Sequence, residues 1–430
     1  MNKLYAGIDF GTSGCRLIII DSDDCVKSST SISYEATAVQ TPDLWWQSVS
    51  KLIKDLPAEI RQNIQSLAID GTSGSILLTD KSGNPSSSVL MYYDMRATEE
   101  AQQIRQTLPQ NSGGQGASTS LARLLWLLTH EANPKHAHAL HQADFILGKF
   151  ANNYRISDVN NCLKLGYDVQ NNCWPKAIFE ELGINPVLLP RVHPAGSAVA
   201  VIDSRISDKL GLPKTVKLVT GTTDSIAAFI ATGATEIGEA VTSLGSTLVI
   251  KLISEKPIFK PELGIYSHRL FDKGKVKWLV GGASNSGGKV LRHYFTQQQL
   301  DTMTPNLKPE KNTGLDYYPL IEKGERFPTA DTHKQPRLTP RPESDIDFFQ
   351  GILEGIAKIE KQGYESLEKL GAASLVSVRS VGGGCHNPAW TQIRDQYLGV
   401  KMISPEHKEA AYGSALLALR AIKKQQSTGS

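Results

Sequence analysis

The segment Val216–Phe229, VKLVTGTTDSIAAF, constrains the fold of this chain more than any other stretch. A run of apolar and β-branched residues is followed by Gly-Thr-Thr-Asp and then by small helix-forming residues. This order predicts a buried strand, a glycine turn and a helix, and such a strand delivers its turn to a cleft. Asp224 is the acidic residue in the turn, and we expect it to be the functional residue of this segment. Metal binding, helix capping and catalysis are all open to it at this point.

A similar pattern occurs at the amino terminus. Lys3–Ile20, KLYAGIDFGTSGCRLIII, predicts a strand, a glycine-rich turn and a returning strand, with Asp9 at the turn. Two acid-bearing glycine turns that are far apart in the chain indicate a repeated unit. We therefore predict a duplicated architecture that closes around one site.

The length and charge of the chain limit its class. With 430 residues the chain is too long to fold around one ordinary hydrophobic core, so two domains are expected. The net charge of +3 is spread along the sequence without a long basic run, so neither nucleic acid nor an anionic membrane is an expected partner. No apolar stretch approaches the roughly 20 residues that span a bilayer, and the start lacks a signal-peptide layout. These features predict a cytoplasmic protein.

Cysteine and histidine do not predict a structural metal site. The five cysteines are scattered without metal-binding spacing and are expected to be free thiols. His136, His138 and His141 lie close together, but neither a cysteine nor a paired acid motif accompanies them. Packing or solvated histidines are therefore expected.

The first glycine turn suits a phosphate group. Leu4–Asp23 is expected to form a β-hairpin with Gly11–Gly14 as its turn and Arg16 on the returning strand. Backbone N–H groups in such a turn converge on phosphate oxygens, and glycine permits close approach of the ligand. An ordinary glycine-rich hairpin remains the alternative.

Two polar segments in the first half suit sugar binding. Ile64–Asp80 predicts a strand that ends in Asp70, followed by the loop residues Gly71–Ser73, whose short hydroxyls suit hydrogen bonds to a polyol. Further on, Asp94 and Arg96 stand at a strand end before a helix, and an acid and an arginine at this spacing suit sugar hydroxyls. Asp94 serves equally well as a helix cap.

Two glycine turns in the second half suit a nucleotide. A hairpin is expected within GATEIGEAVTSLGSTLVIKLI, and its turn, Gly245–Thr247, offers N–H and hydroxyl donors to phosphate. Val376–Gly399 predicts a strand, a triple-glycine turn and a helix. Such a turn lays a base or a ribose against its own backbone because no side chain intervenes.

The remaining segments predict helices and loops. Amphipathic spacing predicts helices over Pro42–Leu56, over Asp345–Leu370 and from Glu406 onward. Segments expected outside helices are the polar loop Ser157–Asn161, the surface excursion Thr302–Pro342 with one short strand at Tyr317–Leu320, and the disordered tail Gln425–Ser430.

In their order along the chain, these turns resemble those of the FGGY carbohydrate kinases of the actin-like ATPase superfamily. The matching segments span nearly the whole chain: GIDFGTSGCRL, YYDMRA, VTGTTDSIAAF, LGSTLVI, SVGGGCHNPAWTQIRDQ and AAYGSALLAL. Singly, only the first and the glycine-rich fifth segment are persuasive, but together they are specific for the family.

The resemblance implies an α/β fold of two actin-like (ribonuclease H-like) domains with a deep cleft between them. Residues 1–231 would bind the sugar, helix 406–424 would pack back at the domain junction, and residues 232–405 would bind ATP. The family pattern implies that Asp224 is the general base, which takes the proton of the sugar hydroxyl during transfer of the γ-phosphoryl group. Asp9 would help to hold Mg²⁺ through water.

Further binding residues are carried over from the same resemblance. Phosphate-facing positions are Thr12, Ser13, Arg16, Gly245, Ser246 and Thr247, and the nucleotide-binding turn contributes Gly383, Gly384 and Asn387. Expected sugar contacts are Ser73, Asp94, Asp224 and Ser225. Ser225 fits a capping or first-turn position of a helix equally well.

The acceptor sugar follows from two departures from the family pattern. The loop IDGTSG stands where xylulose kinases commonly show a Met-x-His-Gly type loop, and Tyr92 replaces the usual Trp of W-x-D-x-R. The DGTSG loop and the short chain look most like members resembling D-ribulose kinases, so phosphorylation of D-ribulose at its C5 hydroxyl is expected. D-Xylulose, L-ribulose and glycerol remain alternatives.

A nucleotide-binding regulator or an ATPase that phosphorylates no sugar is an alternative of another class. Retention of both Asp9 and Asp224 argues against it. The expected partners are a small-molecule sugar and ATP, and the expected assembly is a monomer or a homodimer.

Overall fold

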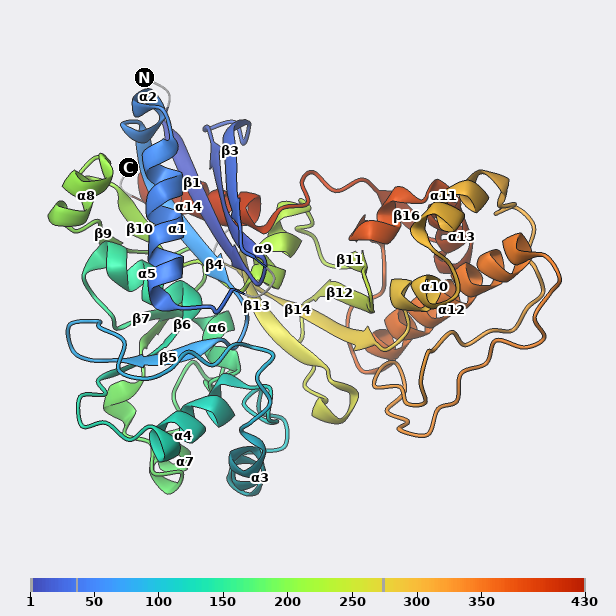
Figure 1. Ribbon diagram of the computed structural model, residues 1–430, viewed down its shortest axis with the longest axis horizontal. Helices are drawn as coiled ribbons and strands as arrows, with labels where there is room; N and C mark the ends of the chain where they lie inside the picture. The colour runs from blue at the N-terminus through green and yellow to red at the C-terminus, as the bar shows by residue number, and fades with distance from the viewer. Residues whose placement is uncertain (1–2, 36–37, 273–274, 429–430) are drawn as a thin grey trace. The chain divides into compact units, whose positions relative to one another are not determined.

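The structure is a computed structural model that describes residues 3–35, 38–272 and 275–428. The chain divides into two compact units. The first comprises Met1–Ala231 together with His407–Ser430, and the second comprises Thr232–Glu406. Each unit is a mixed α/β body built on a six-stranded sheet (Figure 1). The chain therefore completes the first unit only with its last helix.

The sheet of the first unit contains the predicted amino-terminal hairpin. Its strand order is β3 (Val26–Ser33), β2 (Gly14–Ile20), β1 (Leu4–Gly11), β4 (Ile64–Gly71), β10 (Lys217–Val219) and β9 (Ala198–Val201). The first three strands form an antiparallel meander, whereas β4 runs parallel to both β1 and β10. The carboxyl ends of β1, β4 and β10 therefore share one edge, which is where ligands bind in sheets of this kind.

Helix α1 (Pro42–Asp55) begins where the sequence predicts it. The hydroxyl of Thr41 accepts a hydrogen bond from the backbone N–H of Leu44 at 3.1 Å, and Pro42 occupies the first turn, where its missing N–H costs nothing. Trp45 is fully buried in the core beneath the sheet, and Trp46 packs edge-on against Phe150. Both tryptophans thus pack in the unit's core, as the amphipathic spacing indicates.

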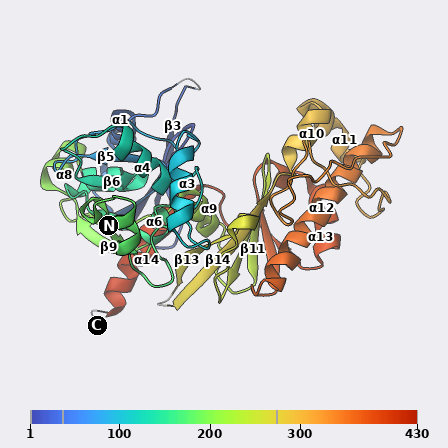
Figure 2. The ribbon, with the colours of Figure 1, turned by 90° about the horizontal axis from the view of Figure 1, so that it is seen from below.

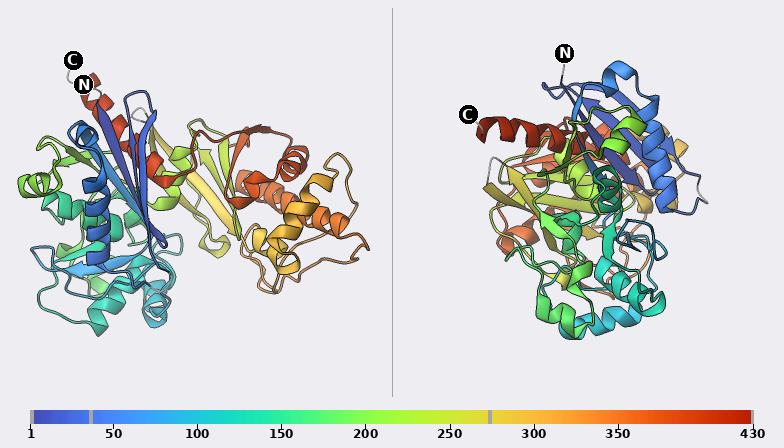
Figure 3. Two further views of the ribbon diagram at one scale, coloured as in Figure 1. Left: turned by 45° about the horizontal axis from the view of Figure 1, so that its top comes forward. Right: turned by 90° about the vertical axis from the view of Figure 1, so that its left-hand side faces the viewer.

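Helices cover both faces of the first sheet. α1 and α5 (Gln142–Ala151) contact one face, and α14 (Ala410–Thr428) and α9 (Asp224–Ala231) lie on the other, as Figure 3 shows for α1 and α14. A Cβ added to Gly7 of β1 would lie 1.9 Å from the carbonyl oxygen of Ala411. The last helix therefore lies directly on the strand backbone, which only glycine and alanine at the contact permit.

The carboxy-terminal helix differs from its predicted limits. It begins at Ala410 and not at Glu406, and it continues to Thr428, so Gln425–Thr428 is helical where a disordered tail was predicted. The predicted tail residues Gly429 and Ser430 lie outside the described part of the chain. Among the described residues, no helix is long and apolar enough to cross a membrane.

Smaller elements complete the first unit. Paired strands outside the main sheet are β5 (Ile76–Thr79) with β6 (His138–His141) and β7 (Ile156–Asp158) with β8 (Arg191–His193). Short helices are α2 (Ala58–Arg61), α3 (Thr98–Thr107), α4 (Ser120–His130), α6 (Val159–Leu163), α7 (Lys176–Glu181) and α8 (Ser204–Leu210). A second apolar core lies among α3, α4 and α7 and contains Leu121, Leu124 and Phe179.

The segment predicted as a polar loop at residues 157–161 is buried secondary structure. Ser157 and Asp158 end β7, and Asn160 and Asn161 lie in α6. The Asp158 carboxylate accepts hydrogen bonds from the backbone N–H groups of Asn160 and Asn161, at 2.8 and 3.3 Å, and so caps the helix. The prediction is wrong because polar side chains that satisfy one another can be buried.

Two of the three neighbouring histidines, His136 and His141, are held by hydrogen bonds to protein groups. The ring of His136 interacts with the Ser86 hydroxyl and the Glu131 carbonyl. His141 is fully buried, and its two ring nitrogens lie 2.9 Å from Asp144 and 3.0 Å from the Ser120 hydroxyl. These two histidines are packing residues, as the sequence predicts.

The second unit repeats part of the strand scheme. Its order is β13 (Tyr266–Asp272), β14 (Lys275–Ser284), β12 (Leu248–Ser254), β11 (Glu239–Leu244), β15 (Ser377–Val381) and β16 (Lys401–Ile403). The hairpin β11–β12 is antiparallel, and β15 runs parallel to β11 as β4 runs parallel to β1. The predicted duplication is therefore present, but the counterpart of the Asp9 hairpin is β11–β12. The Asp224 turn belongs to the same unit as Asp9 because β10 joins the first sheet.

Four helices of the second unit lie on one side of its sheet (Figure 2): α10 (Gly288–Tyr294), α11 (Gln297–Met303), α12 (Asp345–Lys369) and α13 (Pro388–Leu398). The predicted amphipathic helix over Asp345–Leu370 is thus confirmed as α12. A fully buried ion pair joins α12 to α13, with the Arg394 Nε atom 2.6 Å from Glu360. Thr242 of β11 and Tyr364 complete this network.

The excursion between α11 and α12 has little regular structure, as predicted, but its aromatic residues are buried. Tyr317, Tyr318 and Phe327 are each less than 9% exposed. The predicted strand at Tyr317–Leu320 is reduced to an isolated bridge between Tyr318 and Arg337. The excursion therefore covers the unit's core through side chains and not through strand pairing.

Candidate active site

Three acids gather at the carboxyl ends of the parallel strands of the first unit. Asp9 of β1 stands beside Asp70 of β4 in the strand register. One residue further, Gly71 forms a parallel bridge to Thr223, which directly precedes Asp224 at the start of α9. The sequence predicted roles for Asp9 and Asp224, and the register brings both next to Asp70.

Asp70 is fully buried and is held from the far end of the chain. The hydroxyl of Ser414 in α14 donates to its Oδ2 atom at 2.6 Å. Burial first, and then the neighbouring Asp9 charge, raise the pKa of Asp70 well above its usual value. Burial also raises the pKa of Asp9, but the Asp70 hydrogen bond and the Arg16 charge oppose this shift. Burial and the neighbouring charge therefore favour the protonated form of Asp70 more than that of Asp9.

The same pair offers oxygens to a cation. Asp9 Oδ1 and Asp70 Oδ1 are both buried without a hydrogen-bond partner. Buried carboxylate oxygens normally have partners, and Mg²⁺ prefers ligands of this kind. Among the described residues there is no group of three or more acidic, histidine or cysteine side chains arranged to hold a metal ion. The donor set thus fits an ion that keeps water or phosphate oxygens as its other ligands.

The turn of the first hairpin is fixed by its surroundings. Gly11 stands opposite Gly14, which leaves Thr12 and Ser13 exposed at the tip. The Thr12 hydroxyl donates to the Tyr92 hydroxyl at 3.2 Å, and its carbonyl accepts from the Gln40 side chain at 3.0 Å. The predicted turn is confirmed, and its two hydroxyl side chains are accessible to a ligand.

Arg16, which the sequence predicts to face phosphate, forms an ion pair within the protein. Its guanidinium forms an ion pair with Glu409, which precedes α14, and both side chains are more than one third exposed. Arg16 also stands opposite Asp9 across the hairpin. The residue therefore carries a positive charge next to the acid pair, while its predicted contact with phosphate stays a prediction.

Ser73 and Asp94 belong to two adjoining loops. Ser73 is half-buried in the loop between β4 and β5, beside the hydrogen-bonded hydroxyls of Thr72 and Ser75. Asp94 does not cap α3. Burial acts against the charge of Asp94, but the Arg96 guanidinium, 2.9 Å away, lowers its pKa below the usual value. Asp94 is therefore a stable anion.

Arg123 is a functional candidate that the sequence did not single out. It lies fully buried in the apolar helix α4, and its guanidinium donates to the backbone carbonyls of Gly74, Tyr92, Asp94 and Ser118. Burial lowers its pKa to about 10. Arg123 thus ties together the loops that carry Ser73 and Asp94. The signal available in the sequence was a single arginine inside LARLLWLL.

Asp224 and Ser225 open helix α9. The Asp224 carboxylate accepts a hydrogen bond from the Ser225 N–H at 2.6 Å, Asp224 is half-buried and Ser225 is exposed. Ser225 therefore occupies the first turn, which was one of its two predicted roles. Both side chains lie at the sheet edge that also presents Asp9.

The second hairpin rests on the start of α10. Backbone N–H groups of Gly288 and Lys289 donate to the carbonyls of Gly245 and Ser246, at 2.8 and 3.1 Å. A Cβ at Gly287 would lie 2.7 Å from Thr247. Glycine here serves close packing of two backbones. The predicted hairpin is thus present and held by α10, while its contact with phosphate stays a prediction.

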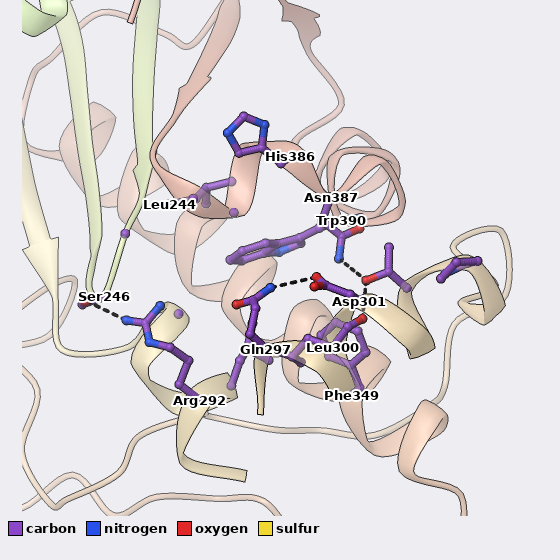
Figure 4. A pocket seen from close by; sticks show the side chains of 17 residues that line it. Leu244, Ser246, Arg292, Gln297, Leu300, Asp301, Phe349, His386, Asn387 and Trp390 are labelled. Atoms are coloured by element: carbon purple, nitrogen blue, oxygen red, sulfur yellow. Dashed lines mark hydrogen bonds between the residues drawn. The ribbon is translucent and has the colours of Figure 1, made fainter. Parts of the chain in front are cut away.

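A cavity of about 650 Å³ lies beside this hairpin within the second unit (Figure 4). Its lining is Leu244, Gly245, Ser246, Gly288, Leu291, Arg292, Gln297, Leu300, Asp301, Thr304, Pro305, Phe349, Gly383, Gly384, His386, Asn387 and Trp390. The predicted positions Gly245, Ser246, Gly383, Gly384 and Asn387 all belong to this lining, and Thr247 does not. A cavity lined by apolar side chains and a few polar groups is typical of small-molecule and cofactor sites.

Trp390 and Arg292 are lining residues that the sequence did not predict. Trp390 is buried, and a Cβ at Gly384 would lie 2.3 Å from its ring, so the glycine lets the ring approach the turn. Asn387 fixes this end of α13 by accepting from the Trp390 N–H at 2.9 Å. Arg292 donates to the Ser246 hydroxyl at 2.7 Å, which places a positive charge at the hairpin (Figure 4).

The fold is that of sugar kinases with actin-like domains. A solved glycerol kinase from Plasmodium falciparum with ADP superposes with a TM-score of 0.84 at 17% identity, covering 98% of this chain and 90% of that chain. The xylulose kinase of Staphylococcus xylosus is 21% identical over 96% of this chain and 89% of its own length. The gluconokinase of Bacillus subtilis is 21% identical over 99% of this chain and 88% of its own.

The family follows from matches along the whole chain. Residues 4–231 match the FGGY family of carbohydrate kinases, N-terminal domain, and residues 240–422 match the C-terminal domain of the same family. The chain belongs to the FGGY family of carbohydrate kinases and is an ATP-dependent carbohydrate kinase. The resemblance inferred from the sequence is therefore confirmed at the level of the family.

Proposed function

We propose that this kinase transfers the γ-phosphoryl group of ATP to the terminal hydroxyl of a pentulose, with D-ribulose as the first choice. The observation that carries the proposal is the position of Asp224, at one sheet edge with the coupled pair Asp9 and Asp70. This edge offers a base for the hydroxyl proton beside oxygens that suit a phosphate-bound cation.

Asp224 acts as the general base. Its carboxylate accepts the proton of the sugar hydroxyl, and the hydroxyl oxygen forms the new bond to the γ-phosphorus. The bond between the γ-phosphorus and the oxygen bridging to the β-phosphorus breaks, and ADP leaves with that oxygen. The hydrogen bond from Ser225 N–H holds the carboxylate in place while it accepts the proton.

The sugar subsite is assigned to the loops that Arg123 connects. Ser73 and Asp94 supply a hydroxyl and a carboxylate for sugar hydroxyl groups, and Ser225 supplies a second hydroxyl at the head of α9. The buried guanidinium of Arg123 holds the two loops through their carbonyls. Rigid positioning of this kind lowers the entropic cost of bringing the hydroxyl to the phosphate.

Asp9, with Asp70 beside it, would hold Mg²⁺ through water molecules that bind the carboxylate oxygens without protein partners. The ion supplies neutralisation of charge on the β- and γ-phosphate oxygens. Thr12, Ser13 and Arg16 are assigned to the phosphates on the first hairpin. Their exposure at the hairpin tip supports this assignment.

The nucleoside is assigned to the cavity of the second unit. The ring of Trp390 and the backbone of Gly383 and Gly384, at the start of the short 3₁₀ helix Gly383–His386, suit the plane of a base. Gln297 and Asp301, which are hydrogen-bonded to each other at 2.8 Å, offer a donor and an acceptor. Gly245, Ser246 and Thr247 are assigned to phosphate oxygens, with Arg292 as an added positive charge.

The acceptor is the finer part of the proposal. The DGTSG loop supports D-ribulose, whereas several relatives carry the name xylulose kinase, which supports D-xylulose as the second candidate. L-Ribulose and glycerol stand behind these two. ADP release should be measured with each acceptor at saturating ATP. We expect the highest kcat/KM with D-ribulose.

The same assay separates the alternatives. Activity restricted to glycerol would contradict a pentulose acceptor, and a preference for D-xylulose would replace the first choice by the second. Hydrolysis of ATP at one rate with and without every sugar would favour the ATPase alternative.

A further inference from the structure

Lys164 is a positive charge in the first unit that none of the steps above uses. It forms the C-cap of α6, directly after Leu163. Its backbone carbonyl accepts from the Leu121 N–H at 3.0 Å, at the start of α4. Two helices from different parts of the chain therefore fix the point from which its side chain starts.

The side chain of Lys164 runs along the sugar-binding loops. A Cβ at Gly74 would lie 3.6 Å from Lys164 Cδ and 3.2 Å from the Nη1 atom of Arg123. Gly74 follows Ser73 directly. The lysine stem therefore passes the loop that carries a predicted sugar contact, next to the arginine that holds this loop.

The charge of Lys164 is poorly compensated. Within the described residues its ammonium group makes no hydrogen bond and no ion pair. Burial lowers the pKa of Lys164, Arg123 acts in the same direction, and the Asp224 carboxylate acts against them. The Asp224 carboxylate is thus the acid whose charge acts on the Lys164 ammonium group.

Lys164 and Arg123 differ in how many hydrogen-bond donors of the side chain remain available to a ligand. The guanidinium of Arg123 is saturated by four backbone carbonyls, so it has a structural role. The Lys164 ammonium group has three N–H donors. None of them is bonded to an acceptor among the described residues, so all three are available to a ligand. A half-buried ammonium group without a partner is costly, and a ligand oxygen with negative charge density would remove that cost.

We propose that Lys164 contacts the acceptor sugar and selects acceptors that carry a carbonyl or carboxylate oxygen over polyols that carry hydroxyls alone. The inference rests on the proposed transfer to a sugar at Asp224 and adds the chemical class of the acceptor. A ketose offers a ketone oxygen and an aldonate offers a carboxylate, and both are better acceptors for an ammonium group than a hydroxyl. Lys164 donates to this oxygen while the terminal hydroxyl at the other end of the same molecule faces Asp224.

The test compares acceptors that differ at one oxygen. D-Ribulose and ribitol have the same carbon chain, but ribitol has a hydroxyl in place of the ketone. For Lys164→Met, we expect kcat/KM with D-ribulose to fall about 10- to 100-fold, the range of a charged hydrogen bond. With ribitol we expect little change, so the preference of the kinase for the ketose collapses. D-Gluconate tests the carboxylate in the same way and separates the two sources of the oxygen.

Two variants control for structural effects. Lys164→Arg keeps the charge and should retain part of the preference for the ketose. Lys176→Met removes an exposed lysine of the same unit and should leave the preference unchanged. Thermal unfolding of the ligand-free proteins should show Lys164→Met to be at least as stable as the parent, because the variant buries no uncompensated charge.

Two outcomes would overturn the inference. One is an unchanged ratio of kcat/KM for D-ribulose and ribitol in Lys164→Met, which includes an equal loss with both acceptors. The other is the same shift in melting temperature by D-ribulose and D-gluconate in the parent and in Lys164→Met. The melting shifts need no turnover. ADP release by the parent protein alone decides whether it is a pentulose kinase, so the two proposals can fail separately.

Discussion

The hairpins in the two sheets follow one strand scheme but differ in charge. In each unit the first strand pairs antiparallel with the returning strand and parallel with a later strand. Two residues before the turn, the first unit has Asp9, with Asp70 beside it on β4. The corresponding position in the second unit is Ser243, with Val381 beside it on β15. The same backbone therefore carries an acid pair in one unit and uncharged side chains in the other.

The buried charges of the two units are also compensated differently. Glu360 of the second unit is paired with Arg394 inside the core. In the first unit, Asp9 and Asp70 each keep one buried oxygen without a partner. The contrast between these two pairs supports the proposal that the reacting groups lie on the first unit.

The largest expected effect is that of the base. Asp224→Ala should lower kcat by about 10²- to 10⁴-fold, the range of a general base, because no group remains to take the hydroxyl proton. ATP affinity, measured by calorimetry, should stay unchanged because the nucleoside is assigned to the other unit. Undiminished phosphorylation of the sugar would contradict the role of Asp224.

The buried ion pair of the second unit should matter for stability and not for chemistry. Arg394→Met leaves Glu360 charged and buried, and we expect a loss of roughly 3–5 kcal/mol in the free energy of unfolding of this unit. Urea titration would measure it. The double variant Arg394→Met with Glu360→Met should regain most of the loss. If it does not, the pair is needed for more than mutual neutralisation.

The matched hairpin positions can be exchanged for neutral residues. Asp9→Asn should lower kcat/KM by about 10- to 100-fold, as loss of a partner of metal-bound water does, and should raise the Mg²⁺ concentration for half-maximal activity. Ser243→Ala, at the corresponding position of the second hairpin, should change neither quantity. Equal effects of the two substitutions would remove the distinction between the hairpins.

The nucleotide turn allows a comparison of two adjacent glycines. Gly384→Ala forces a Cβ against the Trp390 ring and should cost about 1–3 kcal/mol of stability through overpacking. A Cβ at Gly383 meets nothing within 4 Å, so Gly383→Ala should leave the melting temperature unchanged. Calorimetric scans of both variants test this. A lower melting temperature for Gly383→Ala would argue against the packing of this turn.

The last prediction concerns Asp158, a buried acid outside the main sheet of the first unit. Burial, followed by the charge of Asp144, raises the pKa of Asp158 to about 7. The folded state thus binds a proton that the unfolded state has lost, so its stability falls as pH rises from about 4 to about 7, by up to about 1.4 kcal/mol per unit. Asp158→Asn keeps the cap of α6 and should flatten this dependence in urea titrations at several pH values. An unaltered slope would assign it to another group.

The local elements were predictable because their signals are local. The hairpin with Gly11–Gly14, helix α12, and the strand, glycine turn and helix of Val376–Gly399 all follow from periodicity and glycine placement within a few residues. The prediction of a polar loop at Ser157–Asn161 was wrong because the polar side chains there hydrogen-bond one another in the interior and do not contact water. Arg123 and Trp390 went unrecognised because each looks like part of an ordinary helix.

The sequence alone determined which residues can do chemistry at the turns, Asp9 and Asp224 among them, and the family that arranges them. It did not determine their electrostatic state. Asp70 is buried and held by Ser414, a residue 344 positions away, and Lys164 acquires its neighbours Gly74 and Arg123 only through packing. Desolvation and charge pairing depend on distances in space, so only the tertiary structure decided which acid has a raised pKa and which lysine lacks an ion-pair partner among the described residues.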